Sequence, residues 1–413
     1  MRKLSVFSWA FYDFANTIFS MNIVSLYFAL WVVKDLSGKD IYYSFSLSAS
    51  MLAVAISMPF VGALSDNIGK RMPFLFVYTI TCVTLTAILG LVNHLLFALI
   101  FFGFAHYFYQ GALVFYNALL PEVSSPENQG TISGIGVSLG YLGAILGMVL
   151  VMPFVSGKIF NLTIPFIKGG GNKAAFIPTA FFFFIFSLPT FLFIKEKKGI
   201  SKSIENSVVK KVIRIFSKRK EYKPILRYMI ARFFYVDAIN TVITFMSIYL
   251  VKVIGFSEKG DVQFFLIIST IFAIIGSFLF GILADKIGYK KALLLDISLF
   301  ILTVIIAATS FNKKIFFLVG PLSGISLGGV WTCDRPLLVN LSPPDMLGEF
   351  FGLYSLSGKL AAVVGPLLWG FIVFLFEDFG IIRYRIAIGS LFILFATGFL
   401  ILLKVPEKRI ENK

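Results

Sequence analysis

The amino-acid sequence contains two similar halves. The stretch Gly62–Arg71, GALSDNIGKR, has a counterpart at Gly281–Lys290, GILADKIGYK, 219 positions further on, from 62 to 281. Leu119–Gly134 has a counterpart at Leu337–Gly352 with nearly the same offset, 218 positions, from 119 to 337. Because the matches keep their order and spacing, we interpret the chain as two homologous halves of roughly 200 residues. In a membrane protein, parallel halves of this kind are typical of transporters whose site lies between the halves.

The composition indicates a membrane protein. The chain is 58% hydrophobic and only 14% charged, whereas soluble domains carry about 25% charged residues. A soluble fold of this length would expose large apolar patches. The two cysteines, Cys82 and Cys333, lie in apolar runs, so they predict neither a disulfide framework nor a metal cluster.

Twelve apolar runs are long enough to cross a bilayer, which takes roughly 20 residues. We predict an all-α polytopic membrane protein with twelve transmembrane helices in two six-helix bundles, residues 1–194 and 225–413. The first run contains Asp13 and Asn16 and ends without a cleavage pattern, so we expect a retained helix rather than a signal peptide. The predicted runs lie near residues 6–32, 43–65, 72–92, 95–120, 131–155, 175–194, 225–251, 262–284, 291–310, 315–340, 350–376 and 384–403.

The halves are joined by a basic segment. Lys195–Arg227 holds twelve Lys and Arg against three acids, and the positive-inside rule predicts a cytoplasmic linker over residues 195–224. Much of the net charge of +16 therefore belongs to this linker and does not indicate nucleic-acid binding. Both termini are then also cytoplasmic, and in a bacterium the protein would lie in the inner membrane. An alternative for Ser207–Arg219 is an amphipathic helix on anionic lipid.

The duplicated loop supplies acids, cations and glycines at fixed positions between spans 2 and 3 and between spans 8 and 9. Asp66 and Asp285 end a helix, where each can accept hydrogen bonds from a neighbouring helix N-terminus. Gly69 and Gly288 permit a tight turn. We predict a cytoplasmic gate formed by Asp66, Arg71, Asp285 and Lys290.

This duplicated element resembles the signature loop of the major facilitator superfamily. Other stretches resemble its vacuole-effluxer-like branch, whose best-known members export amino acids from the fungal vacuole. The sequence departs from that branch at Cys333–Pro336, where members usually have Ser after the Arg. The stretches that carry the resemblance are Trp9–Asn16 (WAFYDFAN), Tyr116–Pro121 (YNALLP), Ala231–Tyr235 (ARFFY) and Glu349–Lys359 (EFFGLYSLSGK).

Ionisable side chains within membrane spans are costly and usually functional. Asp13 and Asn16 share one face of span 1 because positions three apart are neighbours on a helix, and Asp237 and Asn240 repeat this pattern in span 7. The resemblance implies that spans 1, 4, 7 and 10 line the transport cavity. We expect at least one of these carboxylates to take part in coupling or substrate contact. The alternative is that they only join helices.

Five further polar residues are candidates for substrate or coupling contacts. We expect a loose pairing of Arg232 with Asp237, or an interfacial position for Arg232. Lys359 should have an acidic partner, for which Asp334 and Asp237 are candidates. Whether Asp334 and Arg335 belong to the cavity or the inner gate is left open. These candidates are Asn117, Arg232, Asp334, Arg335 and Lys359.

No phosphate-binding loop, nucleophile elbow or metal-ligand spacing occurs in the sequence, so we expect neither an enzyme nor a cofactor or metal. The predicted function is secondary transport of a small polar solute by a monomer in the lipid bilayer. The favoured substrate is an amino acid, and the favoured coupling ion is the proton. Sugars, other metabolites or drugs, lipid translocation and a sensor role are the alternatives.

Overall fold

The computed structural model describes residues 2–38, 40–159, 162–196, 221–256, 261–362 and 364–408. Within these ranges, twelve helices are long and apolar enough to cross a membrane, as the apolar runs predicted. A helix satisfies all its backbone hydrogen bonds internally, so it is the form that an apolar segment adopts in lipid. The greater part of the linker, including Ser207–Arg219, lies outside the described residues.

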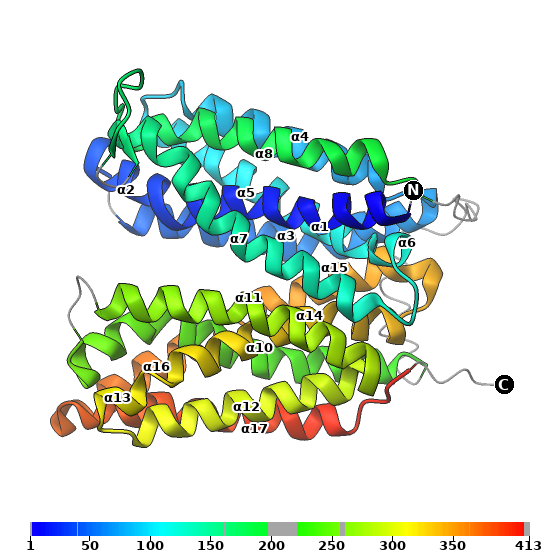
Figure 1. The fold of residues 1–413 in the computed structure, drawn as a ribbon, viewed down its shortest axis with the longest axis vertical. Helices are drawn as coiled ribbons and strands as arrows, with labels where there is room; N and C mark the ends of the chain where they lie inside the picture. The colour runs from blue at the N-terminus through cyan, green and yellow to red at the C-terminus, as the bar shows by residue number, and fades with distance from the viewer. Residues whose placement is uncertain are drawn as a thin grey trace. The chain divides into compact units, whose positions relative to one another are not determined.

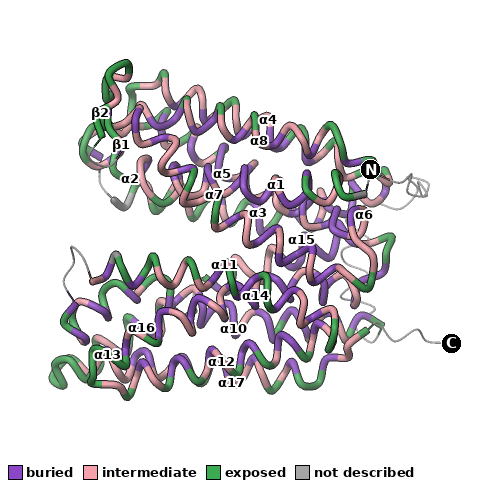
Figure 2. Tube along the Cα trace, in the orientation of Figure 1, coloured by how far each residue is buried: buried purple, intermediate pink, exposed green. Residues whose placement is uncertain are grey.

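The chain forms two compact units. Unit 1 comprises Met1–Ser125 and Leu139–Asn206, and unit 2 comprises Pro126–Ser138 and Ser207–Lys413. In each unit, exposed positions alternate with buried ones along the helices (Figure 2), and many exposed side chains are large and apolar, such as Phe45 and Phe374. Such surfaces suit contact with lipid rather than with water.

In unit 1, α1 packs on α8, α4 packs on α5 and α8, and α3 packs on α5. The first span consists of α1 and its continuation through two π-helical stretches. It runs from Lys3 to Asp35 and is therefore longer than the predicted 6–32. A short antiparallel hairpin follows α7 (Figure 1), with Lys158 paired to Thr163. The elements are α1 (Arg2–Phe19), η1 (Ser20–Tyr27), α2 (Phe28–Leu30), η2 (Trp31–Asp35), α3 (Asp40–Ile68), α4 (Met72–Leu89), α5 (Leu95–Ala118), α6 (Leu120–Val123), α7 (Gln129–Ser156), β1 (Lys158–Ile159), β2 (Leu162–Thr163), η3 (Asn172–Ala175) and α8 (Phe176–Phe193).

In unit 2, α14 lies between α11 and α12, while α17 packs on both α10 and α12. The first turns of α7 also belong to this unit. The elements are α10 (Lys223–Tyr249), η4 (Leu250–Ile254), α11 (Asp261–Ile287), α12 (Tyr289–Thr309), α13 (Lys313–Phe316), α14 (Val319–Leu341), η5 (Pro344–Met346), α15 (Leu347–Leu360), α16 (Val364–Leu375), η6 (Glu377–Phe379) and α17 (Ile382–Leu403).

Span 11 is not the continuous helix predicted over 350–376. Helix α15 ends at Leu360, and α16 begins at Val364. Pro366 is the third residue of α16. Proline lacks a backbone N–H, and within a helix its ring would clash with the carbonyl four residues earlier, so proline is favoured near a helix start and disfavoured within a helix. The proline therefore favours a new helix start within the span.

Candidate functional site

A buried ion pair joins two helices of unit 2. The Nε of Arg232 on α10 lies 3.0 Å from Oδ2 of Asp334 on α14. Asp334 has no exposed surface and Arg232 is 4% exposed. Taking two charges out of water is expensive, and their attraction offsets that cost only when the geometry is good and other hydrogen bonds complete the site. Arg232 is thus buried rather than interfacial, and its ionic partner is Asp334 on another helix.

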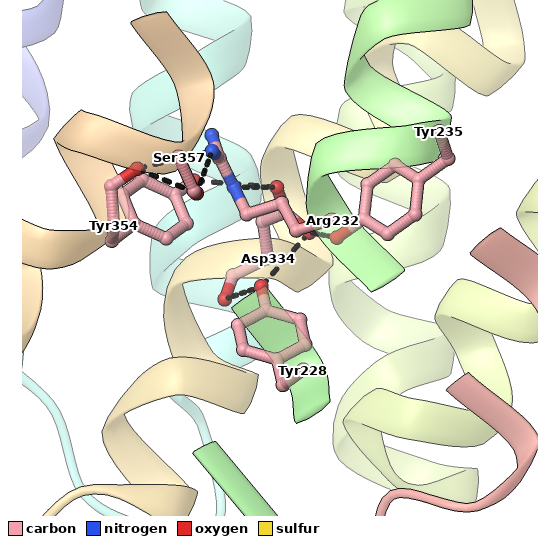
Figure 3. Close-up of polar contacts among 6 residues, drawn as sticks. All are labelled: Tyr228, Arg232, Tyr235, Asp334, Tyr354 and Ser357. Atoms are coloured by element: carbon pink, nitrogen blue, oxygen red, sulfur yellow. Dashed lines mark hydrogen bonds and ion pairs between the residues drawn. The ribbon is translucent and has the colours of Figure 1, made fainter. Parts of the chain in front are cut away.

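Three tyrosine hydroxyls complete the hydrogen bonding of the Asp334 carboxylate (Figure 3). Tyr228 donates to Oδ1 at 3.0 Å and Tyr235 donates to Oδ1 at 2.5 Å, both from α10. Tyr354 of α15 donates to Oδ2 at 3.3 Å. A carboxylate that accepts several such bonds is stabilised in its charged form. The cluster therefore holds a buried negative charge with its hydrogen bonds satisfied.

Arg232 also connects to α15. Its Nη1 donates to the carbonyl of Tyr354 and to Oγ of Ser357, each at 3.1 Å. The guanidinium stacks on the Tyr354 ring, 3.5 Å from the centroid, in a cation–π contact. A side chain at Gly358 would begin 2.8 Å from Nη1, so a glycine leaves the guanidinium its place. One ion pair thereby ties together α10, α14 and α15.

The stretches that resemble the vacuole-effluxer-like branch meet one another within each unit. In unit 2, Ala231–Tyr235 and Glu349–Lys359 supply most of the side chains around Asp334 (Figure 3). In unit 1, Trp9 donates its indole N–H to the Tyr116 carbonyl at 3.0 Å, and the two rings stack at 4.6 Å. The sequence pattern thus corresponds to helix contacts in each unit.

Asp237 lies at the break in span 11. Its Oδ1 accepts a hydrogen bond from the backbone N–H of Gly365, at 2.8 Å, in the first turn of α16. That N–H has no partner within its own helix, and the helix dipole favours an anion there. The side chain is fully buried, and its Oδ2 makes no hydrogen bond to any described residue. The Asp237 carboxylate thus stabilises the start of a broken membrane helix.

Asp13 has different partners in unit 1. Its Oδ1 accepts a hydrogen bond from the Asn16 amide at 3.2 Å. Thr17 Oγ1 lies 2.7 Å from the Asp13 carbonyl and 2.7 Å from the Gly140 carbonyl on α7. The two Asp-x-x-Asn-Thr patterns therefore lie on the first helix of each half, and in unit 2 Asp237 caps another helix.

The remaining candidate residues lie on the helices that carry these groups. Asn117 is on α5, Asn240 follows Asp237 by one turn on α10, Arg335 adjoins Asp334 on α14, and Lys359 is in the last turn of α15, where the helix dipole favours a cation. All four are half-buried: Asn117, Asn240, Arg335 and Lys359. The polar partners Tyr228 and Ser357 could not be recognised from the sequence, because tyrosine and serine are common in membrane helices.

The duplicated loops bind helix ends in both units. In unit 1, Arg71 pairs with Asp66 at 2.9 Å, and the Glu196 carboxylate accepts the backbone N–H groups of Arg71 and Met72, at 2.7 and 3.0 Å. In unit 2, Glu407 accepts the Lys290 N–H at 3.0 Å, and Lys290 Nζ donates to the Leu403 carbonyl at 2.8 Å. Neither glutamate was among the gate residues predicted from the sequence, although each follows the last span of its half.

Asp285 binds the start of α7. Its two carboxylate oxygens accept the N–H groups of Gly130 and Thr131, each at 2.7 Å. The α7 backbone approaches α11 closely there, because a Cβ on Gly130 would lie 2.6 Å from the Gly281 carbonyl. Two charge-assisted bonds at a helix N-terminus form a strong cap. The first turns of α7 are thereby fixed to α11.

We expect Asp285→Ala to loosen this contact. Loss of a cap costs about 1 kcal/mol, which corresponds to roughly fivefold faster opening. Hydrogen–deuterium exchange of a peptide covering residues 126–138 should therefore speed up by about that factor. Asp378→Ala, at an exposed acid, is the control and should leave this peptide unchanged. Unaltered exchange in Asp285→Ala would show that α7 is held by packing alone.

Known proteins resemble the chain over 62% to 97% of its length. It is 26% identical to the uncharacterized MFS-type transporter YxiO of Bacillus subtilis, over 97% of this chain and 94% of that protein. It is 25% identical to the multidrug resistance protein MdtG of Proteus mirabilis, over 85% of this chain and 84% of that protein. Autophagy-related protein 22 of Pichia angusta is 26% identical over 62% of this chain and 51% of its own length.

The fold and the family agree. The crystal structure of a bacterial homologue of the iron transporter ferroportin, in an outward-facing state, superposes with a TM-score of 0.74 at 12% identity, covering 98% of both chains. The family model of the Major Facilitator Superfamily matches residues 13–366 and 258–413. The predicted fold class is thereby confirmed as a multi-pass membrane protein. The chain belongs to the Major Facilitator Superfamily.

Proposed function

We propose that the chain is a proton-coupled secondary transporter of a small polar solute, and that this solute is an amino acid. The observation that carries the proposal is Asp237, a fully buried carboxylate at the interruption of a membrane helix. Broken helices occur in membranes where they are buried in protein or line a cavity, and transporters use their ends to bind charged groups.

The charge state of Asp237 bears directly on α16. As an anion, its Oδ1 accepts the Gly365 N–H and interacts favourably with the start of the helix. Once it has bound a proton, the charge is lost and the interaction weakens. Proton binding at Asp237 would then change how α16 is held against α10. Such a link between charge and helix position is what proton coupling requires.

An amino acid suits the charged groups that are available. Its ammonium needs a carboxylate, for which Asp13 and Asp237 are the candidates, with Asn16, Asn117 and Asn240 as polar neighbours. Its carboxylate needs a cation, a role we assign to Arg335 or Lys359, which are half-buried. Arg232 is less suited, because its guanidinium is occupied by Asp334, Tyr354 and Ser357.

We further propose a monomer that belongs to the vacuole-effluxer-like branch. Its two bundles, 1–194 and 225–413, would be joined by a cytoplasmic linker over 195–224, with both termini in the cytoplasm. In a bacterium this places it in the inner membrane. Asp66, Arg71, Asp285 and Lys290 would form the cytoplasmic gate, because each is bonded at a helix end.

Export of drug-like organic molecules is the second candidate function. It is favoured by the similarity to the protein named multidrug resistance protein MdtG, which extends over 85% of this chain. The two candidate functions differ in which substrate, when added to the liposomes, should cause proton movement. Sugar transport, lipid translocation and a sensor role have no comparable support.

Transport by purified protein in liposomes tests the proposal. With an imposed proton gradient and a lumenal pH dye, a pool of amino acids should cause proton movement in the wild type. Asp237→Asn should reduce this movement to the level of protein-free liposomes, because the amide cannot exchange a proton. The fold should survive, since the Asn oxygen can still accept the Gly365 N–H. Asp13→Asn tests the equivalent residue of unit 1.

The exposed residue Asp378 provides the matched control, because Asp378→Asn makes the same chemical change outside the helix bundle. Unreduced proton-dependent uptake in both Asp13→Asn and Asp237→Asn would exclude these carboxylates as coupling groups. No response to amino acids, together with proton movement upon addition of lipophilic cations, would favour the drug-export function.

A further inference from the structure

Asp296 is a further buried carboxylate, and it lies on α12. Its side chain is fully buried. Neither of its oxygens makes a hydrogen bond to any described residue. This differs from Asp334, which has an arginine and three tyrosines, and from Asp237, which has a backbone N–H. Asp296 is therefore a buried acid whose environment provides little to stabilise a negative charge.

Asp296 packs directly on α14. A Cβ on Gly329 would lie 2.5 Å from Oδ1, so the carboxyl group rests against the glycine backbone. Polar groups beside it are the Ser326 hydroxyl and the Val330 N–H. Together with Cys333, these residues follow the i, i+3, i+4, i+7 spacing of one helix face. The carboxyl group is thus enclosed in the contact between spans 9 and 10.

Among the described residues of the elements packed on α12, no cation lies at this position. Helix α14 contributes Cys333 and Asp334, and the charge of Asp334 is already paired with Arg232. Helix α17 has its ionisable groups at its start, where Arg385 donates to the carbonyls of Ala308 and Ser310 at the opposite end of α12. Helix α11 brings Asp285 and Lys286 at its end, and Asp285 is bound to α7. The start of α12 itself carries Tyr289, Lys290 and Lys291, with Glu407 bound to Lys290.

We propose that Asp296 is a proton-binding site between spans 9 and 10, occupied by a proton in this conformation. An uncompensated buried charge is strongly unfavourable even after the protein relaxes around it, and a group in that position takes up a proton instead. A protonated carboxyl group is neutral and needs only ordinary hydrogen bonds. It also avoids a second negative charge beside Asp334, for which no further cation faces the site.

Release of this proton requires the contact between α12 and α14 to change. As long as Gly329 covers the carboxyl group, an ionised Asp296 is fully buried, and no described cation lies beside it. A rearrangement of α14 that admits water would stabilise the anion and free the proton. Proton occupancy is therefore linked to the packing of spans 9 and 10, independently of Asp13, Asp237 and the identity of the solute.

Infrared spectroscopy of the purified full-length protein can detect this proton directly. The spectrum at neutral pH should contain a carboxylic-acid carbonyl band that shifts upon labelling with carbon-13 aspartate and upon transfer to deuterium oxide. Asp296→Asn should remove this band, because an amide absorbs elsewhere. Asp378→Asn should leave it in place, since an exposed aspartate is ionised at this pH.

Serine variants of α14 keep the test decisive if Asp296→Asn does not fold. Ser326→Ala should shift the labelled band, because the hydroxyl lies beside the carboxyl group. Ser323→Ala, one turn earlier, is the matched control: its hydroxyl donates to the Gly320 carbonyl at 2.9 Å, and the band should not move. If Asp296→Asn instead removes carboxylate absorption and leaves the acid band unchanged, or if neither serine variant moves the band, Asp296 is not the proton site.

Discussion

Asp334→Asn should lower the free energy of unfolding by about 3–5 kcal/mol, the usual cost of removing one partner of a buried ion pair. The amide oxygen can still accept hydrogen bonds from Tyr228 and Tyr235, but the amide nitrogen takes the place of the Oδ2 that accepts from Arg232, so the negative charge and this hydrogen bond are both lost. Arg232 is then left buried without its counter-ion, 4% exposed among α10, α14 and α15. Thermal and denaturant unfolding of the purified protein in detergent would measure the loss.

A second substitution separates the charge from the packing. Arg232→Met in the Asp334→Asn background should recover a large part of the lost stability, because no unpaired charge remains buried. The pair Arg383–Glu377, 4.0 Å apart with the Glu377 side chain exposed, gives the control, and Glu377→Gln should change stability by no more than about 1 kcal/mol. If Asp334→Asn were as mild as Glu377→Gln, the buried pair would not stabilise unit 2.

Gly365→Ala should have the second large effect, because α16 approaches α10 without room for a side chain. A Cβ at Gly365 would overlap Oγ1 of Thr241 and lie 2.9 Å from the Asp237 carbonyl. Overpacking of this kind costs typically 1–3 kcal/mol. The added methyl group would also move the Gly365 N–H away from Asp237. We therefore expect lower thermal stability and, in the liposome assay, reduced transport.

Whether a second substitution rescues Gly365→Ala depends on which atom clashes with the added Cβ. Thr241→Ala removes the overlapping hydroxyl, so the double variant Gly365→Ala/Thr241→Ala should regain much of the stability. At a close contact between α7 and α1 in unit 1, a Cβ on Gly143 would overlap the backbone carbonyl of Phe14 and lie 2.7 Å from Oγ1 of Thr17. Thr17→Ala should therefore not rescue Gly143→Ala. Equal rescue at both positions would mean that the helices separate freely, and the close approach would not be what these glycines provide.

The number and type of elements could be predicted from the sequence because lipid imposes a simple rule. A segment that crosses a bilayer must be apolar and helical whatever its neighbours are, and twelve such segments are found in the structure. The repeated loops could be recognised for a similar reason. A tight turn between two helices depends on local residues, and Gly69 and Gly288 adopt positive φ angles of 71° and 99° there.

The partners of the buried charges could not be predicted in this way. Arg232 and Asp237 are five residues apart, yet Arg232 pairs with Asp334, which is 102 positions away, and Asp237 caps a helix that starts 127 positions later, from 237 to 364. Asp296 is a lone acid in an apolar run and was not among the candidates predicted from the sequence, although any intramembrane carboxylate is a signal of function. The importance of each acid depends on its surroundings.

The sequence by itself determined the membrane environment, the twelve helices, the internal duplication and the turns, since these depend on hydrophobicity and on local backbone preference. Only the tertiary structure decided which acid is paired, which caps a helix and which makes no hydrogen bond to a described residue. Electrostatic and hydrogen-bond energies depend on distance and burial, and helix packing brings together side chains that the sequence separates by a hundred positions or more.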